Sequence, residues 1–162
     1  MRKYFLVFLF LINLYSYCQE IKPTKKYDFA FSPGIILQGN TFNELNLTIG
    51  KVSTENWTVG IVGWRLGIES NFKYDREFII APKIGYDISM TYFTVRLSGI
   101  NYFQNKNSEF RILPEIGVSL GGSFCLTYGY GISLNNSDIS GLSNHRMGLS
   151  FNFNKQLNNA FR

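Results

Sequence analysis

Hydrophobic and polar side chains alternate with a period of two along most of this chain, from about Tyr27 to Asn154. Between Phe78 and Ile88, apolar side chains occupy the even positions, and charged or very small residues occupy the odd ones from Ala81 onward. A period of two indicates β-strands, because successive side chains of a strand point to opposite faces. The pattern therefore predicts strands with one apolar face and one face of charged and small residues.

Turn-rich breaks divide this region into eight extended segments. The predicted strands span residues 27–38, 42–52, 57–70, 77–89, 92–103, 109–121, 124–135 and 145–154. The connections are mostly short, and the longest runs from Asn136 to Asn144. No segment combines a sustained period of 3.6 with capping residues, so we expect minimal helix content.

Charged residues gather on one face of these strands, and no charge interrupts the apolar runs on the other face. The charged set on the opposite face is Asp28, Glu44, Arg65, Glu69, Lys83, Asp87, Arg96, Arg111 and Glu115. Four of these residues are cations and five are anions, a near balance that suits mutual pairing in a confined space. We therefore predict a structural network of ion pairs, in which Glu115 pairs with Arg96 or Lys83. A proton or ion pathway is the alternative interpretation of the same charges.

Glycine, alanine and serine fill the positions between these charges, and their small size decides which face points inward. A soluble periplasmic lipid-binding barrel, the alternative fold, exposes its polar face to water, which sets no limit on side-chain size. The interior of an eight-stranded barrel, in contrast, is only wide enough for side chains to fill it. The sequence therefore predicts an all-β fold, an eight-stranded antiparallel up-and-down transmembrane β-barrel over residues 27–154, whose apolar face meets lipid.

Two further features bear on this barrel. Pro82 and Pro114 lie inside predicted strands, where each forfeits a ladder hydrogen bond. Either β-bulges are present at both positions, which is the prediction here, or the two prolines count against the strand assignment. Aromatic residues also gather near the predicted strand ends, as in the interfacial girdles of membrane barrels. The predicted girdle residues are Tyr27, Trp57, Tyr92, Phe93, Tyr102, Phe103, Phe110 and Phe124.

The first residues have the composition of an export signal. Arg2 and Lys3 precede an apolar stretch, Tyr4 to Leu14, and small residues follow it at the spacing of a cleavage site. The apolar stretch is shorter than the roughly 20 residues of a transmembrane helix, which disfavours an uncleaved anchor. We therefore predict a cleaved signal peptide at residues 1–18 and a periplasmic leader at 19–26.

Export leaves a moderately basic domain with a single cysteine. The formal net charge of the chain is +5, and loss of residues 1–18 removes two cations and no acid, which leaves +3. Only Cys125 then remains, so no intramolecular disulfide can form. A lipoprotein acylated on Cys18 is the alternative, although the bulky Tyr17 departs from the small residue that such signals need.

The sequence gives little support to catalysis or metal binding. One histidine and one mature cysteine provide no ligand cluster, and no phosphate loop or nucleophile elbow occurs. We predict no catalytic residue, no metal site, no cofactor and no nucleic-acid partner. The enzymatic alternative is a lipid-modifying outer-membrane hydrolase with Ser143 and His145 as a pair at the membrane rim.

This pattern resembles the small eight-stranded outer-membrane barrels of Gram-negative bacteria, including uncharacterised ones from the Bacteroidetes. The resemblance rests on the signal ending Cys18-Gln19-Glu20, on the alternating strands, and on the segments 113–117 and 126–131. It implies a place in the cell outer membrane after export, with periplasmic termini and an extracellular loop at 136–144. It also implies two partners, outer-membrane lipid and, during insertion, the barrel-assembly machinery.

Barrels of this kind end on a strand of alternating hydrophobic residues with a terminal aromatic. Met147, Leu149, Phe151 and Phe153 supply the alternation here, but the chain continues into a C-terminal tail at 155–162. The short loops favour a compact monomeric barrel with a structural or interaction role. Its interior is predicted to be filled by side chains and to conduct nothing.

Overall fold

The computed structural model describes residues 27–55, 58–71, 78–105, 107–135, 139 and 141–159. The predicted signal peptide and leader at residues 1–26 lie outside the described residues, as does Trp57 of the predicted girdle. Among the described residues, no helix has the length and apolar character needed to cross a membrane.

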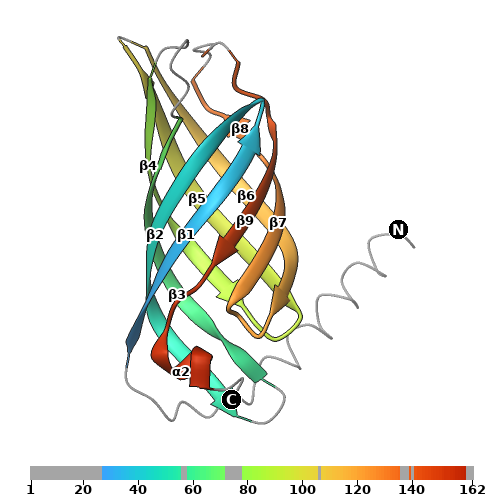
Figure 1. The fold of residues 1–162 in the computed structure, drawn as a ribbon. Helices are drawn as coiled ribbons and strands as arrows, with labels where there is room; N and C mark the ends of the chain where they lie inside the picture. The colour runs from blue at the N-terminus through green and yellow to red at the C-terminus, as the bar shows by residue number, and fades with distance from the viewer. Residues whose placement is uncertain are drawn as a thin grey trace, which may run out of the picture.

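Strands make up most of the described chain (Figure 1). The first four are β1 (Asp28–Gln38), β2 (Asn40–Glu55), β3 (Thr58–Ser70) and β4 (Ile79–Ser89). The next five are β5 (Phe93–Gln104), β6 (Asn107–Leu120), β7 (Phe124–Tyr130), β8 (Ile132–Ser133) and β9 (His145–Phe151). The five-residue helix α2 (Lys155–Asn159) follows the last strand, within the segment predicted to be a tail.

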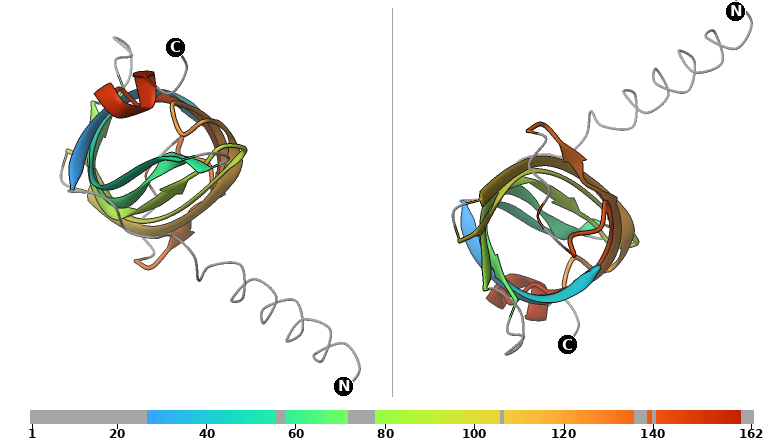
Figure 2. Two further views of the ribbon diagram at one scale, coloured as in Figure 1. Left: turned by 90° about the horizontal axis from the view of Figure 1, so that it is seen from below. Right: turned by 90° about the horizontal axis from the view of Figure 1, so that it is seen from above.

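The sheet closes on itself. Each strand from β1 to β6 pairs antiparallel with the next, β7 also pairs with β9, and β9 pairs with β1, so the strands form the ring seen end-on in Figure 2. Both β7 and β8 pair with β6 in one common register, which makes them two parts of a single wall strand. The fold is therefore an all-β, closed, eight-stranded antiparallel barrel, which confirms this part of the prediction. Below, the end that carries α2 in Figure 1 is called the lower end and the opposite end the upper end.

Proline interrupts the ladder between strands without adding a residue to either strand. Pro82 lies in a gap of the β4–β5 ladder, whose pairs on both sides of the gap keep the same register. Pro114 lies opposite the break between β7 and β8, and that register is also unchanged across the break. The predicted bulges are therefore wrong. A residue without an N–H group removes one ladder bond, and each strand continues past the gap.

Glycine allows two features that other residues would strain. Gly39 forms the tight turn between β1 and β2 with a φ of 73°, a backbone conformation that residues with a Cβ atom rarely adopt. Gly50 of β2 lies opposite Gly63 of β3, and a Cβ atom built on Gly63 would lie 2.4 Å from the Gly50 Cα atom. The two strands therefore approach closely near the lower end because neither residue has a side chain.

The two faces of the wall differ as the alternation predicts. Outward-facing positions carry large hydrophobic side chains on every long strand, among them Phe29, Trp64, Ile84 and Ile116. We call this set of exposed hydrophobic residues the exterior apolar surface. The inward-facing positions carry charged, polar and small side chains, most of which are buried.

Candidate functional site

The barrel interior contains a connected set of buried ion pairs, here called the interior charge network. Lys83 on β4 lies between two carboxylates: its Nζ atom contacts Glu44 and lies 2.9 Å from Oε1 of Glu69. The two carboxylates come from neighbouring strands, because Glu44 of β2 lies opposite Glu69 of β3 in the strand pairing. These two like charges lie side by side and are held together by the cations between them.

Arg146 on β9 joins the carboxylates of three other strands. Its Nη2 atom lies 2.7 Å from Oε1 of Glu69, and its Nη1 atom donates to Oε2 of the same residue at 3.0 Å. Its Nε atom lies 3.1 Å from Glu115 of β6, and Nη2 lies 3.7 Å from Glu44. The two-pronged contact with Glu69 is the strong geometry of an arginine–carboxylate pair.

A third group of charges continues the network toward the lower end. Asp87 of β4 accepts a hydrogen bond from Nη1 of Arg65 at 2.6 Å and another from Nε of Arg96 at 3.0 Å. Nη2 of Arg65 also lies 3.5 Å from Glu44, which joins this group to the carboxylates around Lys83. Arg96 donates from Nη2 to the hydroxyl of Ser150 at 3.1 Å.

A separate ion pair lies nearer the upper end. Nε of Arg111 donates to Oε1 of Glu109 at 2.6 Å, and Nη1 of Arg111 donates to the carbonyl oxygen of Ser143 at 2.9 Å. Gln38 also donates to that carbonyl, at 2.8 Å. The segment before β9 is thereby tied to the inner wall of the barrel.

Charge balance makes this arrangement tolerable in a confined interior. Arg65, Lys83, Arg96, Arg111 and Arg146 supply five positive charges. The five matching carboxylates are Glu44, Glu69, Asp87, Glu109 and Glu115. Each of these ten side chains lies in at least one ion pair, so the interior carries no net formal charge from them. Pairing offsets the desolvation cost that a lone buried charge incurs.

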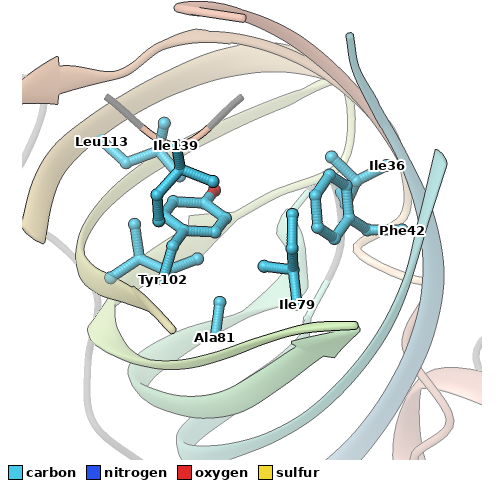
Figure 3. Close-up of a cluster of buried hydrophobic side chains, with 8 residues drawn as sticks. Ile36, Phe42, Ile79, Ala81, Tyr102, Leu113 and Ile139 are labelled. Atoms are coloured by element: carbon cyan, nitrogen blue, oxygen red, sulfur yellow. The ribbon is translucent and has the colours of Figure 1, made fainter. Parts of the chain in front are cut away.

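Apolar side chains cover the network on its upper side. Ile36, Phe42, Ile79, Ile100 and Tyr102 point inward from four strands and pack together. Ile139, from the segment between β8 and β9, lies over Tyr102 in Figure 3 and is buried in the same cluster. We call this cluster, which also includes Ala81 and Leu113, the upper cap.

A second apolar cluster lies at the lower end. Ala30, Val52 and Ile61 point inward from β1, β2 and β3, and the side chain of Leu157 from α2 packs against them. Leu157 has 0% of its surface exposed, although it belongs to a segment predicted to be a tail. We call this cluster the lower cap. The interior charge network thus lies between two apolar caps. The separate Arg111–Glu109 pair lies at the level of the upper cap, because Glu109 is opposite Tyr102 in the β5–β6 pairing.

Eight of the nine sequence-predicted interior charges have buried side chains, and these eight take part in the ion pairs described above. The ninth, Asp28, lies partly exposed at the lower end, where it accepts hydrogen bonds from the side-chain amides of Asn154 and Gln156. Its position at the start of β1 keeps it away from the interior charge network.

Two interior charges were missing from the sequence prediction, Glu109 and Arg146. Both could have been found from the alternation along their strands. Glu109 lies two residues before Arg111, and Arg146 lies two and four residues before Gly148 and Ser150, small residues of the kind assigned to the inner face. Their omission also explains an incorrect pairing. Glu115 pairs with Arg146, and neither Arg96 nor Lys83 lies within ion-pair distance of it.

Tyr102 is a further correction. It was predicted to be part of an interfacial girdle, but its side chain is buried inside the barrel. Its hydroxyl donates to Oε1 of Gln38 at 2.8 Å and lies 3.3 Å from Nη1 of Arg146. Tyr102 therefore links the upper cap to the interior charge network. The neighbouring Phe103 points outward, because successive side chains of a strand point to opposite faces.

The two residues of the hydrolase alternative lie near each other without forming a nucleophile–base contact. The hydroxyl of Ser143 accepts a hydrogen bond from the backbone N–H of His145 at 3.1 Å. The imidazole Nδ1 of His145 instead lies 2.6 Å from the hydroxyl of Tyr128. This geometry does not support activation of Ser143 by the imidazole.

Metal binding also lacks a structural basis in the part of the chain that the structure describes, where no cluster of three or more potential ligands occurs.

Comparisons of the chain with family models, with curated proteins and with solved structures found no match.

Proposed function

We propose that this protein is an outer-membrane β-barrel of a Gram-negative bacterium, with a structural or interaction role and a closed interior that conducts no ions. The observation that carries the proposal is the inverted polarity of the barrel. Its large hydrophobic side chains lie on the outside and its charged side chains lie within.

The exterior apolar surface is too extensive for a protein that is surrounded by water. Among the described residues, 31 large hydrophobic side chains are exposed, whereas only 13 hydrophobic residues are buried. A typical soluble monomer confines its largest exposed apolar patch to about 300–600 Å². Side chains that encircle the barrel in this way suit the hydrocarbon core of a bilayer, which replaces water around the wall.

The interior supports a closed barrel. Arginine, lysine and glutamate side chains from six strands meet in the interior charge network, and an apolar cap lies on each side of it. Ions would need to displace both caps and the paired charges between them. A soluble lipid carrier requires an apolar cavity at mid-height, where this barrel holds ion pairs.

The proposal is tested by locating the protein in cells and then by measuring current through it. We expect the full chain to sediment with outer membranes, to require detergent for extraction, and to migrate differently on gels with and without heating. In planar lipid bilayers, the folded protein is expected to give no stepwise current. Recovery in a detergent-free soluble fraction contradicts the membrane proposal, and reproducible current steps contradict the closed interior.

A further inference from the structure

An open hollow lies at the lower end, where the exterior apolar surface meets α2. Its volume is about 430 Å³, and it is lined by Phe153, Asn154, Lys155, Asn158 and Asn159. The hollow is partly open to the surroundings, so a ligand can enter it without passing through the barrel interior. None of these lining residues belongs to the interior charge network.

The back wall of the hollow is firmly attached to the barrel. The side-chain amide of Asn154 donates to Asp28 at 2.9 Å and to the carbonyl oxygen of Phe29 at 2.8 Å. Its Oδ1 atom accepts hydrogen bonds from the backbone N–H groups of Gln156 and Leu157. The buried side chain of Leu157 fixes α2 in the lower cap. These contacts hold α2 against the barrel and give the hollow a defined shape.

One wall of the hollow is apolar and continues the outer surface of the barrel. Phe153 is 53% exposed and lies on the same outward row as Phe151. Its backbone pairs with that of Phe31, whose side chain is also exposed. A molecule in the hollow therefore contacts the exterior apolar surface through the Phe153 ring.

The other wall is polar and carries a positive charge. Lys155, Asn158 and Asn159 are exposed, so the ammonium group and the two side-chain amides can reach a ligand. Asp28, which bonds the side-chain amide of Asn154, already accepts hydrogen bonds from Asn154, Gln156 and the backbone of Phe29. Lys155 is the only charged residue among those that line the hollow.

We propose that this hollow binds the phosphate headgroup of an anionic phospholipid, with Lys155 as the charge partner and Phe153 against the first part of the acyl chains. The inference rests on the proposed membrane location, which brings lipid headgroups to the end of the apolar surface. The parts of a phospholipid follow the same order as the walls of the hollow. Its hydrocarbon part corresponds to Phe153, its polar linkage to the asparagine amides, and its charged phosphate to Lys155.

The test uses the full chain folded in nonionic detergent micelles and titrated with short-chain phosphatidylglycerol, with native mass spectrometry to count bound lipid. Phosphatidylcholine of the same chain length and inorganic phosphate are titrated in parallel. Lys155→Gln removes the charge of the hollow. Lys51→Gln is the matched control, because Lys51 is an exposed lysine on β2 toward the same end of the barrel, outside the hollow.

We expect Lys155→Gln to weaken phosphatidylglycerol binding about tenfold, as for the loss of one charge-assisted contact. Lys51→Gln is expected to bind like the unmodified protein. Equal binding by Lys155→Gln and the unmodified protein overturns the inference, as does equal binding of the two lipids. If inorganic phosphate binds as tightly as the lipid, the hollow is a free-anion site, which overturns the lipid assignment.

Heat-dependent gel mobility separates this inference from the proposed function. A chain that shows the heat shift and inserts into micelles but lacks charge-dependent lipid binding contradicts only the headgroup site. A chain that stays soluble without detergent contradicts the membrane location, and the headgroup site fails with it.

Discussion

Arg146 is the residue on which the interior charge network most depends. It is 1% exposed and contacts the carboxylates of Glu44, Glu69 and Glu115, which come from three different strands. Lys83 reaches two of these carboxylates, but Glu115 pairs with Arg146 alone among the described residues. Removal of this one cation therefore leaves buried negative charge without compensation.

We predict that Arg146→Met lowers the free energy of unfolding by about 3–5 kcal/mol, the usual cost of removing one partner of a buried ion pair. The measurement is urea unfolding of the folded protein in micelles, followed by tryptophan fluorescence. The physical reason is the uncompensated charge and not lost volume, because methionine fills much of the same space.

The control for this prediction is Lys51→Met, which removes an exposed cation and is expected to change stability by less than about 0.5 kcal/mol. Adding Glu115→Gln to Arg146→Met should restore part of the loss, because one of the unpaired carboxylates becomes neutral. An Arg146→Met protein that unfolds at the original urea concentration contradicts the assigned importance of Arg146.

The alternation of side chains along each strand was sufficient to predict which charges point inward. It does not predict which charges contact each other. Arg146 and Glu69 are 77 residues apart, and they come together only because β9 closes the ring between β7 and β1. Their contact depends on the stagger of all the intervening strands, and the period of two contains no information about stagger. The predicted partners of Glu115, Arg96 and Lys83, were chosen without knowledge of this stagger.

Among the secondary-structure elements, the parts that form the two caps matter most for a closed interior. α2 is only five residues long, too short to show a helical period in the sequence. Its stability comes from tertiary contacts: the side-chain oxygen Oδ1 of Asn154 accepts hydrogen bonds at its first turn, and Leu157 is buried in the lower cap. A short helix of this kind exists because the barrel end accommodates it.

We predict that Leu157→Asp destabilises the folded barrel by about 2–5 kcal/mol, because it removes a buried apolar side chain and replaces it with a charge that lacks a partner. Thermal unfolding in micelles gives the measurement. Asn158→Asp, which introduces the same charge at the next, exposed position of α2, is expected to have little effect. Equal unfolding temperatures for the two variants would count against the lower cap.

The upper cap was hidden by local ambiguity in the sequence. Ile36 stands between Ile35 and Leu37, and Ile79 stands between Phe78 and Ile80, so the alternation cannot distinguish inside from outside by hydrophobicity at these positions. Strand boundaries, in contrast, agreed closely with the structure, because glycine and asparagine mark the turns. Ile139 could not be assigned to the cap because it lies in a loop without any period.

At the scale of the whole molecule, the exterior apolar surface decides how the barrel interacts with its surroundings. In water, replacement of an exposed hydrophobic residue by a charged one is neutral or increases solubility. In a bilayer, the same replacement costs free energy, and the cost is greatest near the middle of the membrane. The direction of the effect therefore distinguishes the two environments.

We predict that Ile84→Arg destabilises the lipid-embedded protein by about 2–4 kcal/mol, because Ile84 is 55% exposed at the midpoint of β4. Tyr92→Arg, at a 69% exposed position beyond the lower end of β4, is the control and is expected to cost about 0–1 kcal/mol. Unfolding in lipid vesicles provides both values. If Ile84→Arg leaves stability unchanged, this part of the wall does not face hydrocarbon.

The position of Arg146 on β9 has a consequence for biosynthesis. A nascent chain that stops before His145 contains four of the interior cations and all five interior carboxylates, one negative charge in excess. The missing cation arrives with the same strand that seals the ring against β1. Neutralisation and ring closure therefore depend on the same strand, and a product truncated before β9 lacks both the seam and the counter-ion.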